Sequence, residues 1–276
     1  MNAIIFYQNS RLVGSLIDAM EYFLYSYLYN KDVYLLLPGK DPRYRLKVLD
    51  IIKNRYSLYP LDNGFDSNVI SITNSNLFRL DLNTSVILDY GSIPHLKCRF
   101  KTKKLLVISE LYTESEYFFF DKKKYNVEYY GEMPFVYSDF KYKMKFLFEF
   151  FSPCNQEGEM IYVNSPGNDI EKDEQLQNYL KVNFPEKEIL QKNAKKHKEN
   201  LFEYFDTYLY YHANKYFDPH PRLFHESFYY SKRVIFENPF NVDDGASLRY
   251  KDLMDNGLNE RYFSKEDEII KQLIRK

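Results

Sequence analysis

The chain has 276 residues, of which 45% are hydrophobic and 28% are charged, and its formal net charge is −1. This length suits one large domain or two small ones, and the composition is that of an ordinary globular protein. No overall field draws such a protein to nucleic acid, and no apolar run reaches the roughly 20 residues of a membrane span. We therefore expect a cytoplasmic protein with no membrane partner.

The first half of the chain alternates short apolar runs with helical patterns. Residues 3–8 (AIIFYQ) combine β-branched and aromatic side chains, which is typical of a buried strand. A helix with one apolar stripe follows, formed by Leu16, Ala19, Met20, Phe23, Leu24, Tyr27 and Leu28. Further strands are expected at 33–39, 68–73, 85–91 and 104–110, and a helix at 41–56. This alternation predicts an α/β layer with a parallel sheet.

Ligands of parallel sheets bind at the carboxyl ends of the strands. The loop after the first strand therefore supplies candidate ligand contacts, which are Asn9, Ser10, Arg11 and Gly14. The loop lacks a GxGxxG pattern, so we infer no dinucleotide, and an ordinary strand-to-helix turn stays open as the alternative.

A second α/β unit is expected in the other half. The aromatic and basic region 111–153 has weak periodicity, and residues 139–159 are typical of a helix or strand that ends in a linker. Strands are then predicted at 160–167, 207–212 and 233–238, and helices at 168–180, 247–257 and 265–276. The sequence thus favours two Rossmann-like lobes, 1–152 and 153–276, with a cleft between them. The only cysteines, Cys98 and Cys154, are expected to be free thiols.

The stretch DPHPRLFHESFYYSKRVIF (218–236) crowds ionisable groups at the start of a predicted helix. A helix that begins near Pro221 presents free N–H groups and the positive end of its dipole, which suit a diphosphate. Arg222 adds a guanidinium with bidentate geometry. Glu226, one turn further, can accept hydrogen bonds from the hydroxyls of a ribose. The alternative is an i,i+4 surface pair of these two residues, worth a few tenths of a kcal/mol.

This stretch resembles the donor-site signature of the GT-B glycosyltransferases. The family pattern is an acidic residue, seven residues, and a glutamate on a helix that runs to a small residue, a lysine and a buried strand. Asp218 and Glu226 match the acidic positions, Ser231 stands where glycine is usual, and Lys232 matches the lysine. The resemblance implies that Glu226 binds the ribose of a nucleotide-sugar, and that Asp218 lies near the transferred sugar as the catalytic residue.

The chain departs from the family directly after the first acidic residue. Pro219 and Pro221 replace glycines whose N–H groups face the donor, and His220 and Arg222 are expected to supply the lost hydrogen-bond donors. Lys232 and Arg249 are further candidates for the donor site. The resemblance implies no essential metal and no cofactor beyond the nucleotide-sugar co-substrate.

The predicted reaction is transfer of a sugar from a nucleoside diphosphate, with UDP favoured, to a hydroxyl group. The resemblance implies retention of configuration, because this spacing of the two acidic residues is more usual in retaining members of the family. Two acceptors stay open: hydroxymethylated pyrimidine in double-stranded DNA, as in the phage DNA-base glycosyltransferases to which the chain is broadly similar, and a cell-surface saccharide precursor. DNA is slightly favoured, and a phage-encoded enzyme would act in the host cytoplasm. A nucleotide-sugar or nucleic-acid binding protein without catalysis is the competing class.

The candidate DNA contacts lie in the first half, where 20 Lys and Arg stand against 17 Asp and Glu in residues 1–150. They are Lys101, Lys103, Lys104, Lys122, Lys123 and Lys124.

Overall fold

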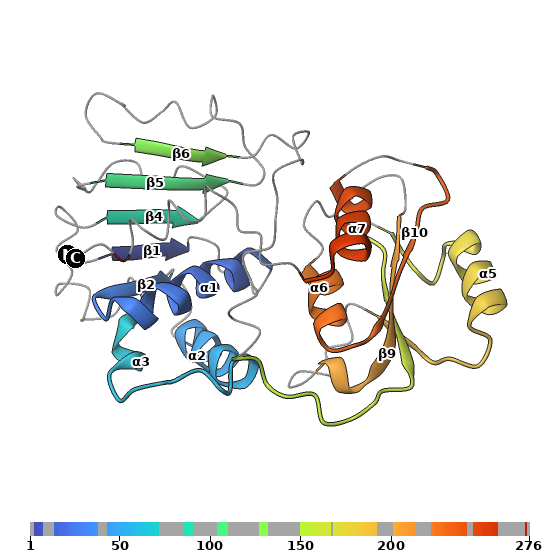
Figure 1. Ribbon diagram of the computed structural model, residues 1–276, viewed down its shortest axis with the longest axis horizontal. Helices are drawn as coiled ribbons and strands as arrows, with labels where there is room; N and C mark the ends of the chain where they lie inside the picture. Colours follow the sequence, from blue (N-terminus) through green and yellow to red (C-terminus); the bar gives the residue numbers. More distant parts are fainter. Residues whose placement is uncertain are drawn as a thin grey trace. The chain divides into compact units, whose positions relative to one another are not determined.

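In the computed structural model the chain divides into two compact units, Met1–Phe150 with Arg261–Lys276, and Phe151–Glu260. The structure describes residues 3–7, 14–37, 43–71, 86–90, 104–109, 127–131, 150–166, 168–191, 201–212, 222–241, 245–258 and 274. Each unit contains its own parallel β-sheet, which confirms the predicted α/β class (Figure 1). The boundary was expected between residues 152 and 153, with 261–276 in the second lobe. The observed division lies two residues earlier and groups 261–276 with the first unit.

Two adjacent phenylalanines mark this boundary. Phe150 belongs to the first unit, where its carbonyl accepts a hydrogen bond from the Leu58 N–H at 3.3 Å and its ring lies 5.4 Å from that of Tyr59. Phe151 belongs to the second unit, where its ring lies 6.3 Å from that of Tyr230. The chain therefore passes from one core to the other within a single peptide bond.

The sheet of the first unit has six strands in the order β3-β2-β1-β4-β5-β6. The strands are β1 (Ala3–Tyr7), β2 (Val33–Leu37), β3 (Val69–Ser71), β4 (Val86–Tyr90), β5 (Lys104–Ser109) and β6 (Val127–Gly131). Strand β6 was not predicted, because VEYYG lacks both a long apolar run and strict alternation. The strand order is that of the doubly wound fold, in which the chain returns to the centre of the sheet after β3.

Three helices of this unit are α1 (Gly14–Tyr29), α2 (Tyr44–Arg55) and α3 (Phe65–Asn68). The predicted apolar stripe of α1 is buried from Leu16 to Tyr27. The neighbouring Glu21 is also buried, and it accepts a 2.6 Å hydrogen bond from the hydroxyl of Tyr56. Helix α1 is thus enclosed on more than the one face that the stripe predicts. No helix among the described residues has the length and apolar character needed to cross a membrane.

The sheet of the second unit has four parallel strands in the order β10-β9-β7-β8. Its elements are β7 (Met160–Asn164), α5 (Glu174–Asn183), β8 (Ile189–Gln191), the 3₁₀ helix η4 (Leu201–Glu203), β9 (Phe205–Tyr211), α6 (Arg222–Tyr229), β10 (Arg233–Glu237) and α7 (Gly245–Asn256). Strand β8 was missed because three residues carry no periodic signal. The 3₁₀ helix η4 was not predicted either, and the remaining strands and α-helices of this unit lie close to their predicted positions.

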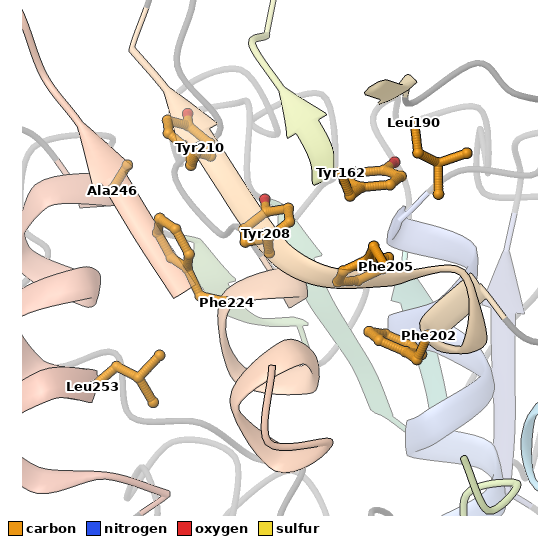
Figure 2. Packing of buried hydrophobic residues seen from close by; sticks show 9 residues of the cluster. All are labelled: Tyr162, Leu190, Phe202, Phe205, Tyr208, Tyr210, Phe224, Ala246 and Leu253. Atoms are coloured by element: carbon orange, nitrogen blue, oxygen red, sulfur yellow. The ribbon is translucent and has the colours of Figure 1, made fainter. Parts of the chain in front are cut away.

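Helices cover both faces of this second sheet. Helix α5 packs its Leu176 and Leu180 against Ile161, Val163 and Leu209. The opposite face packs against α6 and α7 through an aromatic cluster that includes Tyr162, Tyr208, Tyr210 and Phe224 (Figure 2). Successive residues of a strand point to opposite faces, so one strand supplies both cores.

Candidate functional site

The strand order of the second unit defines a switch point between β7 and β9. From β7 the chain passes through α5 to β8 on one side, and later elements build β9 and β10 on the other side. Connections that leave in opposite directions open a crevice at the carboxyl ends of the two central strands, where ligands of such sheets bind. Asn164 ends β7, and His212 directly follows β9.

Three buried polar residues lie at this edge, with exposed fractions of 2% for Asn164, 7% for Ser165 and 3% for His212. The hydroxyl of Ser165 donates a 2.9 Å hydrogen bond to the carbonyl of Tyr211, which ties the end of β7 to the end of β9. The backbone N–H of His212 donates to the carbonyl of Glu237 at 2.9 Å. These residues were not predicted as site residues from the sequence, although each is a polar residue at the end of an apolar strand or directly after it.

Asn164 connects this edge to the aromatic cluster. Its Nδ2 donates a 2.9 Å hydrogen bond to the hydroxyl of Tyr208. Tyr208 pairs in register with Tyr162, which lies two residues before Asn164, so its hydroxyl points toward the carboxyl ends of the strands. Figure 2 shows the hydroxyl oxygens of Tyr162, Tyr208 and Tyr210 on the same side of the cluster. The cluster therefore presents a polar edge toward the switch point.

Helix α6 crosses this face between β9 and β10, and it carries the two predicted donor residues. Nε of Arg222 and Oε1 of Glu226 form an ion pair at 3.3 Å, and their side chains are 13% and 3% exposed. The carboxylate of Glu226 is therefore enclosed. The i,i+4 pair that we considered as the alternative does form, but in the interior of the unit and not on its surface.

The neighbours of Glu226 are enclosed as well. Phe224, His225 and Ser227 are each at most 5% exposed, so one full turn of the helix is buried. Burial first, and the charge of Glu226 second, raise the pKa of the Tyr162 hydroxyl above its ordinary value. Tyr162 of β7 and Phe224 of α6 belong to one buried cluster, so α6 packs against the face of the sheet that carries Tyr162.

The end of α6 has a backbone geometry that favours glycine at position 231. The N–H of Lys232 donates to the carbonyl of Ser227 at 2.8 Å, and the N–H of Ser231 donates to that of Phe228 at 3.0 Å. These two bonds form a Schellman motif, whose residue after the helix adopts the left-handed conformation. Ser231 has φ 57°, in the region that favours glycine. Lys232 completes this cap through its backbone N–H, and its side chain is half-buried.

Most other predicted site residues lie outside the described residues. These are Asn9, Ser10, Arg11, Lys101, Lys103, Lys122, Lys123, Lys124, Asp218 and His220. Gly14 begins α1, Lys104 begins β5 and Arg249 lies within α7, but only the backbone of these three positions is described. Of the predicted donor residues, the structure thus brings together Arg222 and Glu226, with Lys232 at the end of the same helix.

No protein-family model matches the chain, and neither a curated protein nor a solved structure matches it. Its function is therefore argued from the site alone.

Proposed function

We propose that the chain is a glycosyltransferase that moves a sugar from a nucleoside-diphosphate sugar, with UDP favoured, to a hydroxyl acceptor. The observation that carries the proposal is helix α6. It follows a central strand of a doubly wound sheet, holds Arg222 and Glu226 as a buried pair, and ends at a left-handed Ser231 before Lys232 and β10. Within this stretch, Glu226, Ser231 and Lys232 stand at the positions that the resembled donor-site signature uses for its glutamate, its glycine and its lysine.

The chemistry assigned to α6 is electrostatic. The positive end of the helix dipole and the guanidinium of Arg222 would stabilise the negative charge that develops on the leaving diphosphate. Glu226 would accept hydrogen bonds from ribose hydroxyls. A carboxylate has about four acceptor positions, so the contact of Oε1 with Arg222 is compatible with this second role. Asp218 and His220 keep their proposed places beside the transferred sugar and the phosphates, on the basis of the sequence.

The burial of Glu226 adds one requirement. A ribose can reach a carboxylate that is 3% exposed only if groups around α6 move. Donor binding is therefore expected to change the protection of α6 amides against hydrogen exchange, because it rearranges the enclosure of that helix.

The two units are proposed to act as the two lobes of a GT-B enzyme, with the donor in Phe151–Glu260 and the acceptor on the first unit. For the acceptor we retain the hydroxymethylated pyrimidine of DNA, with a saccharide precursor as the alternative. This choice rests on the basic clusters of the first half of the sequence. DNA carrying hydroxymethylated bases and a saccharide hydroxyl acceptor can be compared directly by mass spectrometry of the product.

The donor assignment is tested by thermal unfolding with a panel of nucleotide-sugars and free nucleotides that differ in base and phosphate number. A ligand at 100 times its Kd adds about 2.7 kcal/mol, which corresponds to a rise in Tm of roughly 5–10 °C for a chain of this size. Release of free nucleotide from the same donor reports catalysis. A stabilising donor that is never hydrolysed or transferred would favour the binding-protein class, and no stabilisation by any member would refute the donor site.

A matched pair of variants locates the effect. Glu226→Gln removes the charge but keeps the size of the side chain, and it should weaken donor binding about 10-fold or more, as expected for loss of a charged hydrogen bond. Asp169→Asn makes the same chemical change at an exposed ion pair with Lys172 in the same unit, and should leave binding unchanged. Equal affinities of both variants for the donor would contradict the role of Glu226.

A further inference from the structure

We infer that Asn164 recognises a ribose hydroxyl of the bound nucleotide through its side-chain carbonyl oxygen. The inference rests on the proposed function and assigns a residue that the donor signature does not contain. It is carried by a buried polar atom at the switch point of the second sheet.

The amide of Asn164 is oriented by one hydrogen bond. Its Nδ2 donates to the hydroxyl of Tyr208 at 2.9 Å, while Oδ1 has no hydrogen-bond partner among the described residues. The residue is 2% exposed. A buried acceptor without a partner is costly, and such groups are rare in folded proteins. A ligand that donates the missing hydrogen bond is a physical reason for a buried acceptor without a partner at this position.

The position of Asn164 favours a ligand over a merely structural role. It is the last residue of β7, at the carboxyl ends of the strands that diverge at the switch point. The hydroxyl of Tyr208 orients the Asn164 amide, and the ring centroid of Tyr208 lies 5.8 Å from that of Tyr162 and 5.7 Å from that of Phe224. Phe224 belongs to α6, two residues before Glu226. Asn164 and the proposed ribose carboxylate thus border the same aromatic cluster.

The chemistry of the atom restricts what it can bind. A side-chain carbonyl oxygen only accepts hydrogen bonds, so the ligand group must be a donor. Phosphate oxygens are acceptors and are excluded. A ribose offers two neighbouring hydroxyl groups, which a carboxylate and an amide oxygen at one site can share.

The test is a comparison of ribonucleotides with their 2′-deoxy and 3′-deoxy forms by calorimetry. The wild-type protein should bind the ribonucleotide about 3- to 10-fold more tightly than one of the deoxy forms, the worth of one neutral hydrogen bond. Asn164→Ala should bind both forms with nearly the same affinity. Asn183→Ala makes the same change on the exposed end of α5, where the amide donates to the Tyr179 carbonyl, and should keep the wild-type preference.

A second variant covers the case in which Asn164→Ala does not fold. Tyr208→Phe removes the hydroxyl that orients the amide and should reduce the preference for the ribose hydroxyl. If the folded Asn164→Ala protein, or Tyr208→Phe in its place, keeps the wild-type preference, the inference is overturned. If Asn164→Ala instead loses selectivity among bases, the ribose assignment is wrong. Wild-type protein that binds no nucleotide at all would refute the proposed function itself, which distinguishes the two failures.

Discussion

Removal of the Glu226 carboxylate is expected to destabilise the second unit strongly. In Glu226→Ala the guanidinium of Arg222, whose side chain is 13% exposed, loses the carboxylate that lies 3.3 Å from it. Loss of one member of a buried ion pair typically costs about 3–5 kcal/mol, whereas an exposed i,i+4 pair is worth about 0.3–0.5 kcal/mol. The total stability of a domain is only about 5–15 kcal/mol, so the substitution should remove a large part of it.

The assay is urea unfolding followed by far-UV circular dichroism, because the chain has no tryptophan. The midpoint should fall while the slope with denaturant stays constant, which identifies a change in stability. Arg222→Met should lose a similar amount, because it removes the cation that forms an ion pair with the buried carboxylate. The double variant Arg222→Met/Glu226→Leu should lose much less than the sum, since neither charge remains to be desolvated.

Two results would refute this reasoning. A loss below about 0.5 kcal/mol in Glu226→Ala would show that the pair behaves as a surface pair. Additive losses in the double variant would show that the two side chains do not interact. Asp169→Ala is the control, because its ion pair with Lys172 has side chains 52% and 83% exposed and its loss should lie within experimental error.

Three further predictions concern stability. Ser231→Gly should stabilise the protein by about 0.5–1 kcal/mol, or roughly 1–4 °C in Tm, in a calorimetric scan. The reason is that relief of the left-handed backbone strain outweighs the greater conformational entropy of glycine in the unfolded chain. Ser231→Ala should give no gain in the same scan. Gly158→Ala should cost about 3 kcal/mol or more by urea unfolding, because its Cβ would lie 2.0 Å from the carbonyl carbon of Tyr204, and a near-neutral result would contradict that close approach. Burial by itself would raise the pKa of Asp206. Hydrogen bonds from Lys187 and Thr207 outweigh this effect and hold that pKa below its ordinary value of 3.8. The stabilisation by the ionised Asp206 is present above about pH 4 and lost at lower pH. The Tm of the wild type should therefore fall more steeply than that of Asp206→Asn between about pH 5 and pH 3. Parallel curves of Tm against pH would exclude a contribution of Asp206 to the pH dependence of stability.

Local patterns in the sequence predicted much of the fold. The apolar run of β1, the stripe of α1 and the Pro and Gly that follow β2 each act within a few residues, so they can be recognised without the tertiary structure. The alternation of these elements was enough to predict parallel α/β sheets. The short β8 and the unpatterned β6 escaped because strand pairing with neighbours, and not local preference, stabilises them.

The residues proposed for the donor site show the same division. Their types and spacing were readable, and so was the unusual serine at the glycine position of the motif. The burial of Glu226 was not, because it depends on the packing of α6 between the sheet and other parts of the second unit. Asn164 was not recognised either, since a single asparagine after a strand gives no signal until the strand order places it beside the switch point.

The sequence by itself determined the α/β class, the two units and the chemical types gathered at the start of α6, because these follow from composition and short-range periodicity. The tertiary structure decided the order of the strands and the enclosure of the Arg222–Glu226 pair. It also decided the close packing of Gly158 against the backbone of Tyr204, where a linker was expected. The physical reason is that burial and desolvation arise from residues far apart in the chain, and these set the energy of a charged pair far more than its spacing does.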